Sequence, residues 1–280
     1  MRWRHAWWFA LCCAPMAHAI SLEDVVARLD ADAAGGRPLV AHVVVALCDN
    51  EFQGIVPVSA KLGDGDAPQS NLYWGAMYGV RSYFRKLPGW QSMAIAPSGD
   101  PRVLDRVLFK RELTRGARTT QVLLLAEAWR GRNIADAIRH FLEMNRGEHP
   151  ERLHAGELEF EAGSAAHVIV YVGHNGLMDF SAPSLPPIRS APRSHASVVL
   201  ACMSESYFTP LLDKDSLPLI TTSGLMAPEA YSLAALLDAW FSGGDGAQAR
   251  LAAARAYAKY QRTSENAARR LFVTHAGRAP

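Results

Sequence analysis

Five short apolar runs constrain the fold of this chain more than any other feature. Most are rich in β-branched residues and have few polar interruptions, a pattern typical of strands buried on both faces of a parallel sheet. The runs are Leu39–Leu47, Val122–Leu125, Val168–Val172, Ser197–Ala201 and Leu217–Thr222. We therefore expect a sheet whose two faces are both covered.

Helical patterns lie between and after these runs. Ser21 followed by Asp24 is a capping signal, and the Gly pair after Ala34 is a stop signal, which predicts a helix over 21–34. Four further helices are expected over Tyr73–Phe84, after Asn133, after Pro228 and over Ala247–Gln261. Strands that alternate with helices predict an α/β fold with a mostly parallel sheet sandwiched by helices.

The first nineteen residues have the pattern of a secretory signal peptide. Arg2 and Arg4 precede the apolar run 6–14, and small residues at Ala17 and Ala19 form a cleavage signal. We expect residues 1–19 to be removed and residues 20–280 to fold as a single domain. The protein is then exported, either periplasmic or secreted. No later stretch is apolar for long enough to span a bilayer.

Composition and charge exclude several classes. The chain of 280 residues is 49% hydrophobic and 20% charged, which excludes a disordered or fibrous protein. Lys and Arg number 29 against 27 Asp and Glu, and removal of Arg2 and Arg4 leaves 27 of each sign. This balance argues against a nucleic-acid partner. The sequence leaves the oligomeric state open.

The residues after three of the predicted strands suggest chemistry. Cys48 and Asp49 follow the first run, His174 follows the third, and Cys202 follows the fourth. The carboxyl ends of parallel strands share one edge of a sheet, so we expect these side chains to lie close together. A cysteine and a histidine are the minimum equipment for acyl transfer, in which a thiolate attacks a carbonyl and an imidazole protonates the leaving amine.

The blocks around His174 and Cys202 resemble those of the caspase–legumain group of cysteine peptidases, clan CD. The segment 201–208, Ala-Cys-Met-Ser-Glu-Ser-Tyr-Phe, is similar to the legumain cysteine block. The family usually has Gly directly after the His, whereas here Asn175 precedes Gly176. The resemblance implies a caspase-like architecture with Cys202 as nucleophile, His174 as general acid/base, and the amides of Gly176 and Cys202 as oxyanion donors.

The same resemblance bears on the redox state of the two cysteines that remain after processing. In the caspase-like order, the strand that ends at His174 lies between the strands that end at Cys48 and Cys202. Two strand spacings are about 9.5 Å, and a disulfide needs α-carbons within about 7 Å. We therefore expect both thiols to be free.

Other residues are candidates for a substrate pocket around this pair. They are Cys48, Asp49, Asn71, Tyr73, Trp74, Asn175, Ser204 and Glu205. The chain has no zinc-binding HExxH or CxxC spacing and no glycine-rich nucleotide loop, so neither a metal nor another cofactor is expected.

The leading hypothesis is an exported thiol-dependent peptidase or amidase that cleaves an amide bond in a peptide or protein substrate. An alternative is a catalytically inactive caspase-like module that binds a peptide or glycan through Asn71, Tyr73 and Trp74. A third is a structural protein in which Cys48 and Cys202 pair.

Overall fold

The computed structural model describes residues 20–187, 192–212 and 215–277. The predicted signal peptide, residues 1–19, lies outside the described residues. Within the described ranges, no helix is long and apolar enough to cross a membrane.

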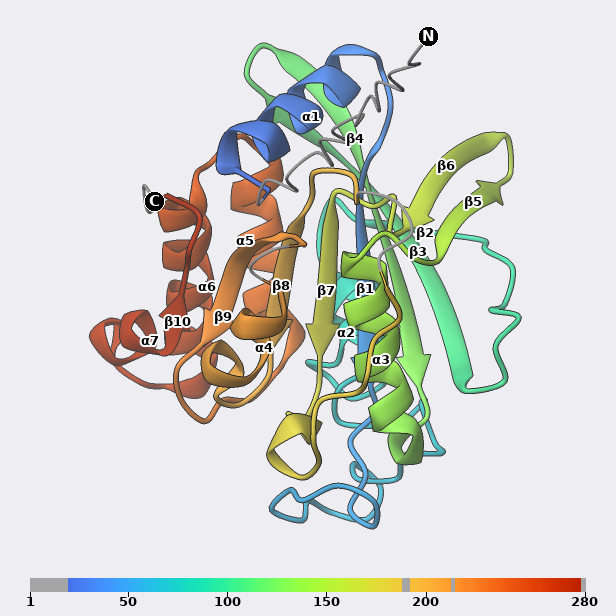
Figure 1. Cartoon of the computed structure of the whole chain (residues 1–280), viewed down its shortest axis with the longest axis vertical. Coiled ribbons are helices and arrows are strands. Elements are labelled where there is room, and N and C mark those ends of the chain that lie inside the picture. The colour runs from blue at the N-terminus through green and yellow to red at the C-terminus, as the bar shows by residue number, and fades with distance from the viewer. Residues whose placement is uncertain (1–19, 188–191, 213–214, 278–280) are drawn as a thin grey trace, which may run out of the picture.

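An eight-stranded sheet forms the centre of the molecule (Figure 1). Its order is β10-β9-β8-β7-β1-β4-β3-β2, and the five central strands from β9 to β4 are parallel. Two antiparallel strands extend it beyond β4, and β10 pairs antiparallel with β9 at the other edge. The bounds are β1 Leu39–Ala46, β2 Gln91–Met93, β3 Val103–Arg115, β4 Arg118–Trp129, β7 Val168–Val172, β8 Ala196–Leu200, β9 Leu217–Thr222 and β10 Phe272–Val273. The fold is therefore α/β with a large, mixed, mostly parallel sheet, as the sequence predicts at this level.

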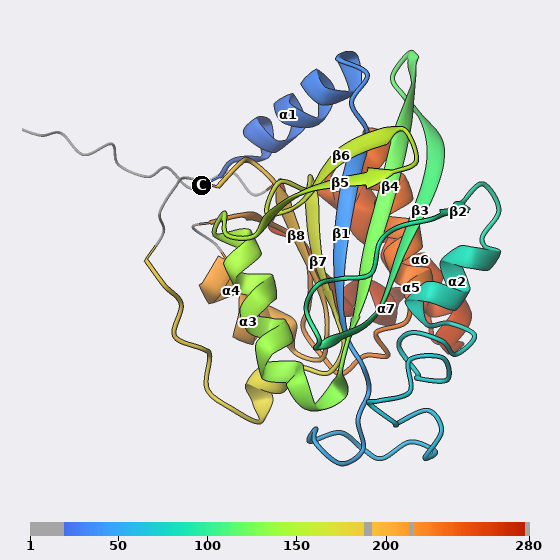
Figure 2. The ribbon, with the colours of Figure 1, turned by 90° about the vertical axis from the view of Figure 1, so that its right-hand side faces the viewer.

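Helices cover both faces of the sheet (Figure 2). One face packs on α1 Leu22–Ala34, α2 Val80–Lys86, α5 Ala230–Phe241, α6 Gly246–Gln261 and α7 Glu265–Leu271. The other face packs on α3 Ile134–Asn145, α4 Ser204–Leu212 and the separate hairpin of β5 Pro150–Ala155 and β6 Leu158–Gly163. Two short 3-10 helices, η1 Gly131–Asn133 and η2 Gly176–Met178, begin connections at the carboxyl edge.

The buried runs explain why the central strands form where they do. All eight residues of β1 are buried, and successive side chains alternate between the two helical layers: Val43 and Val45 pack on one side, Val44 and Ala46 on the other. A strand that meets apolar helices on both faces gains from an uninterrupted apolar sequence. The four shorter runs behave in the same way, and β4 extends well beyond its predicted core of 122–125.

The helix predictions differ in accuracy. The predicted capping box of Ser21 and Asp24 is present at the start of α1. The predicted helix over 73–84 is wrong in its first half, because residues 73–79 form turns and α2 begins at Val80. Tyr73 and Trp74 are buried in the main core. The helix-like spacing of the aromatic residues therefore arises because a folded loop packs them into the core.

Candidate active site

Cys202 lies at a sharp turn between β8 and α4. Met203 has a positive φ of 53°, which is uncommon for a residue with a side chain, and its N–H donates to Gly224 O at 2.9 Å. The half-buried Cys202 thiol contacts the backbone of Met226 twice: Sγ lies 3.5 Å from Met226 O and accepts from Met226 N–H at 3.3 Å. The turn therefore holds the thiol at the end of β8, two residues before a helix begins.

His174 lies at the end of β7, next to β8 in the sheet. Its ring Nε2 is 2.7 Å from Asp179 Oδ2, and its carbonyl accepts a hydrogen bond from the buried Tyr171 hydroxyl at 2.8 Å. The other ring nitrogen, Nδ1, has no hydrogen-bond partner among the described residues. Asp179 thus fixes the ring through one nitrogen and leaves the second without a partner among the described residues.

The two loops are in direct contact. Val172 of β7 is in register with Leu200 of β8, so His174 and Cys202 each lie two residues beyond an aligned pair. The side chain of Asn175 donates to Cys202 O at 2.7 Å. The imidazole and the thiol share no hydrogen bond in the described structure. Catalytic hydrogen bonds are often long before substrate binds, so this geometry is compatible with a catalytic pair.

The backbone amides differ from the prediction. The Gly176 N–H, predicted as an oxyanion donor, donates to His174 O at 3.1 Å within its own turn. Among the described residues, the N–H groups of Asn175 and Cys202 have no acceptor. The amide directly after the histidine therefore has no partner among the described residues, whereas the amide of Gly176 is engaged.

Asp179 is the functional candidate that the sequence analysis missed. Its Oδ2 also accepts from Gly54 N–H at 3.0 Å, which joins the loop after β1 to η2. A Cβ on Gly54 would lie 2.3 Å from Asp179 Oδ1, so glycine permits this approach. A carboxylate five residues after the histidine, within one short loop, was the only signal for it in the sequence.

Cys48 is buried beneath the site and is distinct from it. It has no exposed surface, and burial raises the pKa of its thiol to about 11, although the Tyr73 hydroxyl hydrogen-bonds to it. Burial also raises the pKa of Tyr73, and that hydroxyl interacts electrostatically with both Cys48 and Cys202. Both cysteines are free, and β7 lies between β1 and β8, so both of these predictions are confirmed.

The predicted pocket residues Asn71 and Trp74 stabilise the loop after β1. The fully buried Asn71 side chain pairs with the backbone of Cys48, accepting from its N–H at 3.1 Å and donating to its carbonyl at 2.7 Å. The Trp74 indole N–H donates to Asp105 at 2.9 Å. In the described structure Asn71 and Trp74 have no exposed surface and Tyr73 is 7% exposed, so none of the three presents an open surface to a ligand.

Three other predicted pocket residues also have local partners. Asp49 Oδ1 accepts from the N–H groups of Glu51 and Phe52, at 2.9 and 3.1 Å. Ser204 is fully buried and its Oγ bonds to β8 and β9 backbone. Glu205 lies on the exposed side of α4, 3.9 Å from His275. The structure thus brings together His174, Asn175 and Cys202, with Tyr73 beneath them.

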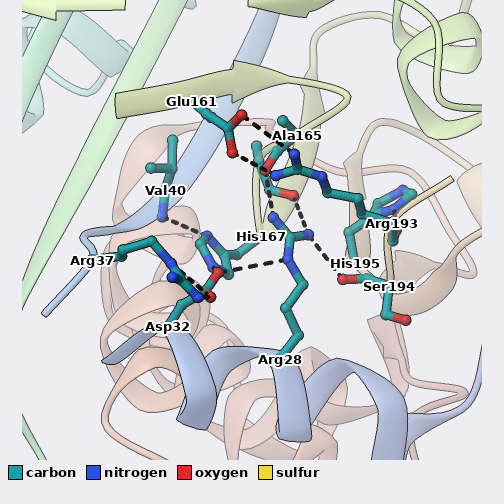
Figure 3. A network of polar contacts seen from close by, with 11 residues as sticks. Arg28, Asp32, Arg37, Val40, Glu161, Ala165, His167, Arg193, Ser194 and His195 are labelled. Atoms are coloured by element: carbon teal, nitrogen blue, oxygen red, sulfur yellow. Dashed lines mark hydrogen bonds and ion pairs between the residues drawn. The ribbon is translucent and has the colours of Figure 1, made fainter. Parts of the chain in front are cut away.

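A polar network lies at the opposite, amino edge of the sheet (Figure 3). Arg28 of α1 donates to the carbonyls of Ala166 and Ser194 at 3.0 and 2.9 Å, and His167 Nε2 is 2.8 Å from Asp32. A cavity of about 510 Å³ opens beside them. Its arginines are already paired with carboxylates or carbonyls: Arg152 with Glu159, Arg193 with Glu161, and Arg37 with Asp32. We interpret this network as structural.

No group of three potential metal ligands occurs among the described residues. The chain matches no protein-family model, no curated protein and no solved structure.

Proposed function

We propose that the protein is an exported cysteine peptidase or amidase of caspase-like architecture, related to the caspase–legumain group. The observation that carries the proposal is the arrangement of Cys202 and His174 at the same level of two adjacent parallel strands. The Asn175–Cys202 hydrogen bond of 2.7 Å joins their loops. The strand order β8-β7-β1, with the His strand between the two Cys strands, supports the caspase-like part of the proposal.

The proposed reaction proceeds in two steps. The Cys202 thiolate attacks the substrate carbonyl, the C–N bond breaks, and protonated His174 gives its proton to the leaving amine. The acyl group is left as a thioester on Cys202. In the second step neutral His174 takes a proton from water, the hydroxide attacks the thioester, and the C–S bond breaks. The acid leaves, and the Cys202 thiolate and protonated His174 are restored.

Backbone groups near Cys202 can stabilise the two negative charges in this reaction, the thiolate and the oxyanion of the tetrahedral intermediate. The unpaired N–H groups of Cys202 and Asn175 can donate to the oxyanion of the tetrahedral intermediate. The N–H of Met226, 3.3 Å from Sγ, can donate to the thiolate. Helix α4 begins at Ser204, and the positive end of its dipole favours a negative charge at the preceding turn.

Asp179 positions His174 in this proposal. A neutral His174 that donates from Nε2 to Asp179 carries its lone pair on Nδ1, the nitrogen with no partner among the described residues. The carboxylate therefore selects the tautomer that can accept a proton, and it stabilises the imidazolium that forms.

A second function is a catalytically inactive caspase-like module that binds a peptide or glycan. The observation in its favour is the contact of the Cys202 thiol with the Met226 backbone, rather than with the His174 ring. A thiol held in this way and never ionised by His174 would act as a packing group.

The rate of Cys202 alkylation by iodoacetamide separates the two functions. We expect the thiol to react at pH 6, and the His174→Ala variant to lose that reactivity, because the imidazole stabilises the thiolate. Cys48→Ser provides the background for both proteins, since it removes the other free thiol. A Cys202 that is equally inert in both proteins contradicts the peptidase proposal and favours the binding module.

A further inference from the structure

Large hydrophobic side chains are exposed at one edge of the molecule. Within the described residues they number six, and we call them the apolar rim: Phe52, Val56, Met77, Met178, Tyr207 and Leu225. All six lie on segments that follow the parallel strands β1, β7, β8 and β9 in the chain. The loop after β1 and η2 lie at the lower edge of the molecule in Figure 1. None of the described residues at the amino edge of the sheet belongs to this set.

The segments of the apolar rim are bonded to the catalytic loops. Leu225 adjoins Met226, whose backbone contacts Cys202 Sγ, and Met203 N–H donates to Gly224 O on its other side. Met178 adjoins Asp179, the partner of His174. Leu225 and Met178 are therefore each next in sequence to a residue that contacts the thiol or the imidazole.

The loop after β1 contacts the loop that carries Asp179. Gly54 N–H donates to Asp179, so Phe52 and Val56 flank the residue that touches the histidine loop. The Phe52 ring also lies under the Arg132 guanidinium at 5.5 Å. Val56 is 87% exposed, so nothing in the described chain covers it.

Carboxylates interleave with the rim and help to identify its occupant. Glu51 precedes Phe52, Asp179 follows Met178, and Glu205 lies on the same helix as Tyr207. Negative charges between the apolar side chains disfavour an anionic bilayer surface. A peptide that lies across Cys202 presents alternate side chains to such a rim and its carbonyl to the thiol.

We propose that the substrate is a peptide with large apolar side chains next to the cleaved bond, which become buried against Met178 and Leu225. This inference rests on the proposed peptidase function and adds its substrate class. Exposed apolar side chains gain from burial only when a partner covers them, and here Met178 and Leu225 adjoin residues that contact the reacting groups. One methylene group more or less in a hydrophobic site changes discrimination between substrates by about 10- to 200-fold.

The experiment compares two irreversible peptide probes with the same acyloxymethyl ketone group. One carries leucine before the reactive group and the other carries aspartate, and iodoacetamide reports the thiol without any peptide contact. We expect the leucine probe to label Cys202 at least tenfold faster than the aspartate probe. Leu225→Ser and Met178→Ser should each lower the ratio of leucine-probe to iodoacetamide rates about fivefold or more. Lys61→Ser, an exposed polar position on the loop after β1, is the control and should leave the ratio unchanged.

The outcomes distinguish the two proposals. Equal rates for both probes, with iodoacetamide labelling that still depends on His174, overturn the substrate class and leave the peptidase function standing. Absence of labelling by all three reagents overturns the peptidase function itself. Sedimentation that shows a dimer dissociated by Leu225→Ser, with an unchanged probe ratio, assigns the rim to a second copy of the chain and overturns the inference.

Discussion

Strand β7 carries a histidine at each end, and each histidine is paired with an aspartate. His167 precedes the strand and its Nε2 lies 2.8 Å from Asp32; His174 follows the strand and its Nε2 lies 2.7 Å from Asp179. The difference lies in the second ring nitrogen. Val40 N–H donates to His167 Nδ1 at 3.0 Å, whereas His174 Nδ1 has no partner among the described residues.

The two histidine–aspartate pairs therefore differ in the hydrogen bonding of the second ring nitrogen, although both have the same contact between Nε2 and a carboxylate. At the amino edge, every hydrogen-bonding position of the ring is filled, and burial lowers the pKa of His167 to about 4, so the ring stays neutral and holds α1 on the sheet. At the carboxyl edge, one nitrogen of His174 has no partner among the described residues, and the His174 loop contacts the Cys202 loop. We therefore expect substitutions of His174 to affect activity and substitutions around His167 to affect stability.

The largest expected difference is in activity. His174→Gln should lower the rate of amide cleavage by about a hundredfold to ten-thousandfold, the usual contribution of a general acid/base. His167→Gln, the matched variant at the other end of β7, should leave the rate per folded molecule unchanged. The measurement is kcat/KM on a peptide substrate, with the folded fraction determined by circular dichroism. Equal losses of kcat/KM in the two variants would contradict a catalytic role that is specific to His174.

The next largest effect is a loss of stability caused by a substitution at the amino edge of the sheet. Arg28→Ala should reduce the free energy of unfolding by about 2–4 kcal/mol, because it leaves the carbonyls of Ala165, Ala166 and Ser194 without their charged donor. Burial lowers the pKa of this guanidinium to about 10, which reflects its enclosed position. Urea denaturation measures the loss.

Arg37→Ala is the control for this variant. Arg37 also pairs with Asp32, but its side chain is 64% exposed, so the expected loss is less than about 1 kcal/mol. Two similar values would contradict the interpretation that Arg28 is the structural centre of the amino-edge network.

Asp179→Asn should produce an intermediate loss of activity with little loss of stability. An amide at this position can bond to either His174 tautomer, so the ring loses its preferred orientation, and we expect kcat to fall about 10- to 100-fold. The pH profile of kcat should shift in the variant, which a purely structural role would not produce. Asp32→Asn at the amino edge should instead lower stability and leave that profile in place.

The buried strands and the positions of Cys202 and His174 could be predicted because each depends on a local pattern. An uninterrupted β-branched run has few alternatives to a doubly covered strand, and residues after such strands must meet at one edge. The capping box of Ser21 is equally local. Strands β3, β5 and β6 were not predicted, because they are partly exposed and their alternation is interrupted by charged residues.

The details of the site could not be predicted because they depend on backbone conformation. Nothing in the order His-Asn-Gly indicates that Gly176 N–H turns back to His174 O. Asn71 and Trp74 look like ligand contacts in sequence, yet the loop folds over them and uses both as internal partners. The role of Asp179 depends on a loop from β1 that only the tertiary fold brings near.

The smallest expected effect is a pH dependence of stability that arises from three buried histidines. Burial lowers the pKa of His167 and His195 to about 4 and that of His140 to about 3. Below the unfolded value near 6.5 the unfolded chain binds more protons than the folded chain, so stability is complete above pH 6.5 and declines toward pH 4. Each of these histidines should contribute a loss of about 1 kcal/mol between pH 7.5 and 5.5. Urea denaturation at several pH values measures the slope.

His167→Gln tests the geometric cause of this slope. A proton on Nδ1 would remove the acceptor of Val40 N–H, so the folded state resists protonation at this ring. The variant should be less stable than wild type at pH 7.5. As the pH falls, its free energy of unfolding should decrease more slowly than that of wild type, because one fewer proton is taken up on unfolding. Arg37→Ala removes a neighbouring group that does not titrate in this range and should keep the wild-type slope. If the stability of His167→Gln depends on pH as steeply as that of wild type, the folded protein does not resist protonation of His167. The two histidines of β7 would then differ only in that His174 lies in a loop that contacts the Cys202 loop.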